Sequence, residues 1–117
     1  MSPDLDQTFA ALADPTRRGV VELLRERPRR AGELARDLAM SAPAMSRHLR
    51  VLRQGGLVDE HAAPDDARAR VYELRIEPFQ ELSGWVQDVE AFWTEQLGSF
   101  RDHVEAKARA RRGRSRK

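Results

Sequence analysis

The chain has 117 residues, which suits a single domain with one modest core. It has no cysteine, and this excludes disulfides, thiolate metal sites and a cysteine nucleophile. Apolar residues make up 40% of the chain and charged residues 34%, and no apolar run approaches the roughly 18 to 20 residues of a membrane span. The first residues show no export signal, so we expect a cytoplasmic protein.

The net charge of +2 conceals an uneven distribution of charge along the chain. Residues 107–117 hold seven Lys or Arg and no acid. Residues 25–53 hold eight Arg against three acids, whereas residues 73–105 hold eight acids against two Arg. Basic segments in an otherwise acidic chain predict a localised binding surface for a polyanion, and argue against general affinity over the whole surface.

The N-terminal part of the chain predicts two helices. Leu5, Phe9 and Leu12 recur at helical spacing and predict one apolar face of a short helix. Asp14 followed by Pro15 is a good start signal, because Asp caps a helix and Pro suits its first position. The second helix therefore begins there and ends before Pro28.

A helix–turn–helix follows. A third, short helix contains residues 34–38, and residues 39–40 form the turn. Ser41 is a candidate N-cap for a fourth helix, which runs from Ala42 to about Gln54. Two consecutive glycines after Gln54 readily supply a left-handed residue and end it.

The last third of the chain predicts a hairpin and a long helix. Two short strands flank the polar stretch 61–67, and the second passes through residues 71–74. A helix that begins at residues 77–78 and spans roughly 26 residues, or about 39 Å, completes the domain. Its apolar side chains lie within a sector of about 140°. They are Leu82, Trp85, Val86, Val89, Phe92, Trp93, Leu97, Phe100 and Val104.

This order of elements is typical of a winged helix-turn-helix, a mainly α-helical fold with a small β-hairpin. We assign residues 1–106 to this DNA-binding and dimerisation domain, and we expect residues 107–117 to form a disordered basic tail. The tail either adds non-specific attraction to phosphates or only keeps the protein soluble, and the sequence leaves both open.

The fourth helix turns a polar face outward when Met45, Leu49 and Leu52 face the core. Arginine bonds guanine edges bidentately, and Gln or Ser can reach adenine or phosphate. The alternative is an ordinary solvated helix face, which the adjoining turn, the hairpin and the local positive charge disfavour. The outward residues are Pro43, Arg47, Arg50 and Gln54, with Ser46 and Arg53 beside them.

Arg68 and Arg70 flank the second strand of the hairpin and predict contacts of the wing with phosphate. The alternative is that they only protect an edge strand. Asp65 and Asp66 at the tip of the hairpin argue against deep entry into a groove. For His48, a structural role in orienting the fourth helix is favoured over a contact with a base.

The apolar face of the last helix predicts a homodimer. So small a monomer has little surface to cover this face, and an exposed patch of this size drives association. The alternative is that the face lines a small-molecule cavity. We expect the dimer interface to contain Leu5, Phe9, Leu82, Trp85, Val89, Phe92, Trp93, Leu97 and Phe100.

Several segments of the chain resemble one known family, the ArsR/SmtB family of bacterial repressors. The resemblance lies in residues 9–18, 33–35, 40–58 and 70–74 and in the tryptophan pair of the last helix, and covers about residues 5–100. It implies that the fourth helix enters the major groove, that the hairpin touches the flanking DNA, and that the first and last helices form the dimer. By position, it implies that Ala42, Pro43, Ser46, Arg47 and Arg50 face DNA.

The chain departs from the metal-sensing members of that family. Arg36 and Asp37 stand where thiolates would lie in the third helix, and the last helix has only one histidine, His103. The resemblance therefore implies the branch without metal-sensing ligands, and we expect no metal and no cofactor.

We therefore expect a regulator that binds an inverted repeat in double-stranded DNA as a homodimer and represses its own or a neighbouring operon. The alternative is a winged-helix protein-interaction module, which the acidity of residues 73–105 would suit. An enzyme is disfavoured because no phosphate loop, ligand cluster or paired nucleophile and base is present. The operator, the regulated genes and any small-molecule effector stay open.

Overall fold

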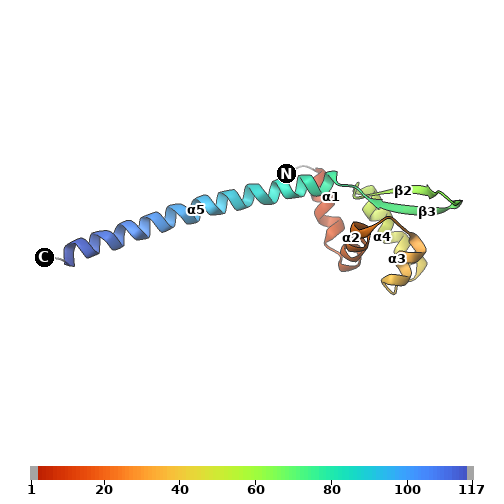
Figure 1. Cartoon of the computed structure of the whole chain (residues 1–117), viewed down its shortest axis with the longest axis horizontal. Helices are drawn as coiled ribbons and strands as arrows, with labels where there is room; N and C mark the ends of the chain where they lie inside the picture. Colours follow the sequence, from red (N-terminus) through yellow and green to blue (C-terminus); the bar gives the residue numbers. More distant parts are fainter. Residues whose placement is uncertain (1–2, 116–117) are drawn as a thin grey trace. The chain divides into compact units, whose positions relative to one another are not determined.

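The computed structural model describes residues 3–115, and the side chains of residues 4–112. The chain divides into two compact units, residues 1–82 and 83–117, and α5 continues across the boundary (Figure 1). The elements within the described residues are α1 (Pro3–Leu12), α2 (Pro15–Glu26), β1 (Arg29–Arg30), α3 (Ala31–Asp37), α4 (Ala42–Gln54), β2 (Val58–Ala63), β3 (Asp66–Leu74) and α5 (Glu77–Ser115). The predicted fold, mainly helical with a small wing, is confirmed.

The starts of α2 and α4 are set by the predicted capping residues. The Asp14 carboxylate accepts a hydrogen bond from the Thr16 backbone N–H at 3.3 Å. The Ser41 hydroxyl accepts one from the Ala44 N–H, also at 3.3 Å. These bonds satisfy backbone donors that have no partner within the helix, so α2 and α4 begin at the predicted residues.

The turn between α3 and α4 contains a residue in an unusual conformation. Ala39 has φ of 52°, a left-handed value that glycine adopts more easily. The Met40 N–H donates to the Ala35 carbonyl at 2.8 Å, which closes this turn. After α4, Gly56 takes φ of 77°, as expected for the pair of glycines that ends this helix.

One core holds the helix–turn–helix and the base of the wing together. The three α4 residues predicted to face inward are all within it, at no more than 1% exposure. The buried residues of this core are Ala11, Val20, Val21, Leu24, Leu34, Ala35, Met45, Leu49, Leu52, Leu57 and Val58. Phe79, in the first turn of α5, packs partly buried against it. Burial of Met45, Leu49 and Leu52 fixes which side chains of α4 point outward.

The wing is a three-stranded antiparallel sheet, with β3 between β1 and β2. Figure 1 shows β2 and β3 as a hairpin beside the helices. Glu60 lies opposite Tyr72, and Ala62 opposite Arg70, before the register shifts at Ala63. The sequence does not predict β1, because its two arginines form no strand pattern. β1 is a strand because its backbone pairs with β3, with Arg29 opposite Tyr72.

The last helix is longer than predicted. It has 39 residues rather than roughly 26, and it continues to Ser115. Residues 107–115, expected to form a disordered tail, are drawn as part of this helix, and residues 116–117 lie outside the described part. Ala, Lys and Arg are strong helix formers, and positive charge is favourable near the C-terminal end of a helix dipole.

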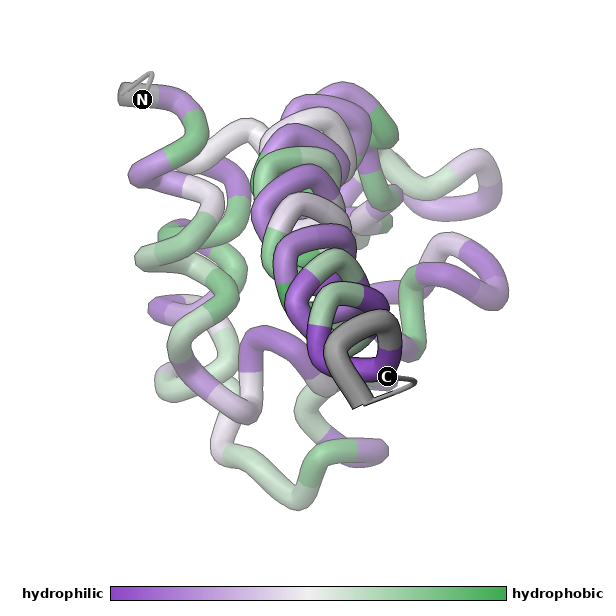
Figure 2. Tube along the Cα trace, turned by 90° about the vertical axis from the view of Figure 1, so that its left-hand side faces the viewer, coloured by the Kyte–Doolittle hydropathy of each residue, from purple (hydrophilic) through white to green (hydrophobic). Residues whose placement is uncertain are grey.

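The apolar face of α5 is exposed in the single chain. Figure 2 shows hydrophobic residues recurring along this helix between hydrophilic ones. Phe92, Trp93, Leu97 and Phe100 are each between 57% and 67% exposed. Large aromatic side chains usually bury most of their surface, so this face is suited to association with another surface.

Candidate nucleic-acid interface

The outward face of α4 presents two arginines that have no ion pair or side-chain hydrogen bond with any side chain the structure describes. Arg47 and Arg50 are exposed, and among the side chains that the structure describes neither forms an ion pair or a side-chain hydrogen bond. Ala42, Pro43 and Ser46 are also exposed on this helix. The guanidinium groups are therefore available to a ligand without first breaking an internal contact.

A polar contact with α2 holds α4 in position, in addition to its packing on the core. His48 is half-buried, and its Nδ1 lies 3.3 Å from Nη1 of Arg17 on α2. A carboxylate oxygen of Asp14 lies 3.9 Å from the same nitrogen. This geometry agrees with the structural role favoured for His48, because its ring faces α2 and the start of that helix.

β3 of the wing carries the two predicted arginines. Arg68 is exposed, and its backbone N–H donates to the Asp66 carboxylate at 3.0 Å. Arg70 is exposed, but its Nε lies 3.2 Å from Oε1 of Glu60. The wing tip is held as well, because Asp65 forms an ion pair with Arg30 at the start of α3.

Glu60 of β2 links the wing to α4, a role that the sequence analysis did not predict. Its carboxylate pairs with Arg53 of α4 and with Arg70 of β3, and it accepts a hydrogen bond from the Tyr72 hydroxyl at 3.2 Å. The strand register places Glu60 and Tyr72 opposite each other on one face of the hairpin. The two-residue period of β2 and β3 was the signal that could have found it.

A small hollow lies where α4 meets the wing. Ser46, Arg50 and Arg53 of α4 line it together with Glu60 and Tyr72 of the wing. Burial and the nearby Glu60 carboxylate raise the pKa of Tyr72 above its ordinary value. The structure therefore brings two of the predicted α4 residues, Ser46 and Arg50, together with the wing around one hollow.

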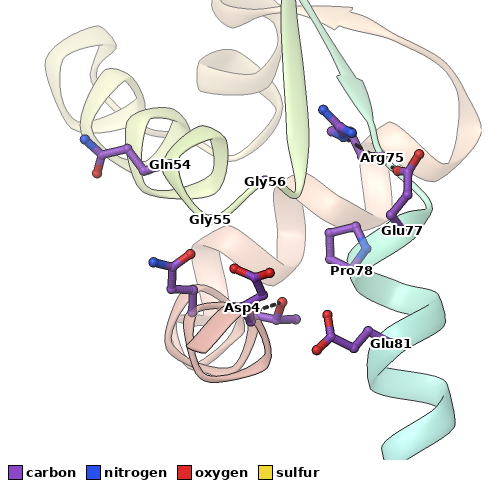
Figure 3. Close-up of a pocket in the computed structure, with 10 residues that line it drawn as sticks. Asp4, Gln54, Gly55, Gly56, Arg75, Glu77, Pro78 and Glu81 are labelled. Carbon is purple, nitrogen blue, oxygen red and sulfur yellow. Dashed lines mark hydrogen bonds and ion pairs between the residues drawn. The ribbon is translucent and has the colours of Figure 1, made fainter. Parts of the chain in front are cut away.

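Gln54 lies apart from the other predicted α4 residues. It is exposed at the C-terminal end of the helix, where Gln7 of α1 shares two shallow hollows with it. Figure 3 shows the larger hollow, with Asp4 and Glu81 on opposite sides of it and Arg75 beside Glu77. Arg75 pairs with Glu77 at 3.6 Å, so the one cation lining the hollow is engaged by an acid within it.

The residues predicted for a dimer interface differ in exposure. Phe9 and Leu82 are half-buried, and Trp85 and Val89 are exposed at 40% and 36%. Leu5 differs from the rest, since its side chain is 4% exposed in the single chain. Little of Leu5 is left for a partner, because it is already a core position of its own chain.

Two further properties concern metals and membranes. Within residues 3–115, no three His, Cys, Asp or Glu side chains gather in a group that could hold a metal ion. No helix in that same range combines the length and the apolar character needed to cross a bilayer.

Comparison with known proteins shows which family this chain resembles. The family model for the bacterial regulatory proteins of the arsR family matches residues 14–60, which contain the helix–turn–helix and the start of the wing. The HTH-type transcriptional regulator Rv2034 of Mycobacterium tuberculosis is 41% identical over 101 residues, which cover 86% of this chain and 89% of that protein.

Two other comparisons agree. The transcriptional repressor SdpR of Bacillus subtilis is 29% identical over 82 residues, covering 70% of this chain and 88% of that protein. The structure of an ArsR-like transcriptional regulator from Rhodococcus sp. RHA1 superposes with a TM-score of 0.70 at 27% identity, covering 83% of this chain and 89% of that one. All three relatives are described as regulators or repressors of transcription.

Proposed function

We propose that this chain, which belongs to the ArsR family of bacterial regulatory proteins and is a DNA-binding transcriptional regulator, is a homodimeric repressor that binds an inverted repeat. In this proposal α4 enters the major groove, and Arg47, Arg50 and Ser46 contact base edges. Arg68 and Arg70 of the wing contact the flanking backbone. A regulator of bacterial genes would act where the chromosome is, in the cytoplasm.

The observation that carries the proposal is the state of the α4 arginines. Arg47 and Arg50 are exposed and, among the described side chains, have no internal partner, on a helix whose opposite side is fully packed. A rigid helix with unengaged guanidiniums supports base readout, because little has to move or break before binding.

The homodimer is supported by the exposed aromatic face of α5. One chain leaves Phe92, Trp93 and Phe100 more than half exposed. A second copy is the partner that two-fold symmetry in an inverted repeat requires. Pairing along α5 would join two copies of α4, as the two half-sites of an inverted repeat require.

Binding-site selection from a random duplex library tests the proposal, followed by mobility shifts with the selected duplex and with DNA upstream of the gene. We expect an inverted repeat whose half-site centres are about 10 base pairs apart, and affinity that falls as salt rises. Failure to enrich any sequence, with no salt-sensitive shift, would contradict it. That outcome would favour the protein-interaction module.

A further inference from the structure

The interface contains two classes of arginine, which differ in whether an acid of the same chain engages them. Arg47 and Arg50 have no such partner among the described side chains. Arg53 at the C-terminal end of α4 and Arg70 in β3 both pair with Glu60. One carboxylate therefore holds Arg70, which is proposed to contact the DNA backbone, and Arg53 next to it.

Glu60 is placed for this by the geometry of the hairpin. In β2 and β3 alternate side chains point to the same face, so Glu60, Tyr72 and Arg70 share the face that adjoins α4. The Glu60 side chain is 18% exposed, whereas those of Arg53 and Arg70 are 51% and 55% exposed. The carboxylate is thus fixed and partly shielded, while the guanidiniums that it holds remain within reach of solvent.

We propose that Glu60 is a specificity-determining positioning residue, which competes with DNA phosphate for Arg53 and Arg70 and so weakens binding to arbitrary sequences. The inference rests on the proposed function. On random DNA, contact of these arginines with phosphate requires exchange of one anion for another, and this exchange brings little net gain. On a matched site, base contacts by Arg47 and Arg50 supply the binding free energy, and Arg53 and Arg70 keep their pairs with Glu60, so removal of Glu60 adds less affinity there than on random DNA.

The substitution Glu60→Gln tests this inference, because it removes the charge and keeps the size of the side chain. Affinity for a random duplex should rise by roughly 3- to 10-fold, as the two arginines become available to phosphate. The plot of log Kobs against log salt should steepen by about 1.8 per protomer, about 0.9 for each arginine. The preference for the selected duplex over the random one should fall by about threefold or more.

Glu73→Gln is the matched control. Glu73 is an exposed acid of the same hairpin that pairs with His61 at 3.1 Å and touches neither arginine. The Glu73→Gln substitution removes the same charge from the wing, so its effect on DNA affinity measures the general electrostatic contribution alone. In a Glu60→Gln, Arg70→Ala double variant, about half of the steepening should disappear.

The single tyrosine supplies an independent readout of the contact. Burial and Glu60 together raise the pKa of Tyr72, so Glu60→Gln should lower it toward the ordinary value. Absorbance of the tyrosinate in an alkaline titration of the free protein measures this, with no dependence on DNA. An unchanged Tyr72 titration would overturn the assigned contact.

A purely structural role for Glu60 predicts a different pattern. Affinities for the selected and random duplexes would then fall together, with no change in the salt slope, and this result would overturn the inference. If the wild-type protein discriminates between sequences and Glu60→Gln does not alter the discrimination, only this inference fails. If the wild-type protein discriminates between no sequences, the proposed function itself fails.

Discussion

The guanidinium of Arg17 contacts His48 and so connects α2 to α4. Its Nη1 lies 3.3 Å from the His48 Nδ1, while its Nε donates to the Ala11 carbonyl at 2.7 Å and its Nη2 to the Ala10 carbonyl at 3.1 Å. These carbonyls end α1 and have no acceptor role within it. One side chain thus joins three helices behind the surface proposed to contact DNA.

Replacement of Arg17 by methionine should lower the free energy of unfolding by about 1 to 3 kcal/mol, because the Ala11 carbonyl and the half-buried His48 imidazole lose their donor. The Ala10 carbonyl keeps the Ala13 N–H at 3.4 Å. Urea denaturation measures this loss. Arg25→Met is the matched control, since Arg25 is exposed and pairs only with the exposed Glu22 on its own helix. Its effect should stay within about 0.5 kcal/mol, and equal effects of the two variants would contradict the bridging role.

Leu52 tests the packing of α4 on the core. It is 0% exposed, so Leu52→Ala should cost about 2 to 5 kcal/mol of unfolding free energy through lost burial and a residual cavity. The neighbouring Val51 is 37% exposed, and Val51→Ala should cost much less. Thermal or urea unfolding followed by circular dichroism compares them. A small effect at Leu52 would mean that α4 is not seated as described.

Glu33 predicts a dependence of stability on pH. A hydrogen bond from the Arg27 side chain and another from the Arg30 backbone lower the pKa of Glu33 below its ordinary value. A lowered pKa in the folded state contributes stability above the ordinary value and loses it as pH falls through the lowered one. Glu33→Gln should therefore be less stable than wild type at neutral pH, and the difference should shrink in acid.

Urea midpoints of wild type and Glu33→Gln, measured from neutral pH to below about pH 4, check this expectation. Glu22→Gln is the control, because the pair that Glu22 forms with Arg25 is about two-thirds exposed on both sides. Exposed pairs contribute little, so this variant should match wild type throughout. A difference for Glu33→Gln that stays constant with pH would refute the prediction.

The exposed face of α5 predicts the oligomeric state. Trp93→Glu places a charge in the middle of the apolar row, where pairing with a second copy would bury it, and should yield a monomer of about 13.3 kDa. Glu95→Gln, on the opposite side of the helix, should leave a dimer. Size-exclusion chromatography with light scattering measures both masses. A monomeric wild-type protein at micromolar concentration would contradict the dimer.

The local signals in the sequence predicted most of the fold. Asp14 and Ser41 cap helices where they were expected to, and the apolar period of α4 correctly separated Met45, Leu49 and Leu52 from the outward arginines. These features are encoded within a few residues of chain. A capping side chain or a helical period can therefore be read without knowledge of distant partners.

The features that the sequence did not reveal depend on partners far apart in the chain. β1 exists because Arg29 and Arg30 meet β3 some 40 residues later, and Glu60 matters because Arg53 and Arg70 approach it from two elements. α5 is longer than the apolar period predicts, because its charged end lacks apolar residues but is rich in the strong helix formers Ala, Lys and Arg.

The affinity of Arg47→Ala for the selected duplex tests most directly whether α4 reads DNA. It is compared with the affinities of wild type and Arg25→Ala in the same buffer. We predict that Arg47→Ala binds more weakly by about 1 to 3 kcal/mol, keeps the dimer mass and loses preference at one base position in each half-site. Arg25→Ala should bind as wild type does, because Arg25 lies on α2 and pairs with Glu22. Unchanged affinity and unchanged sequence preference in Arg47→Ala would contradict the account.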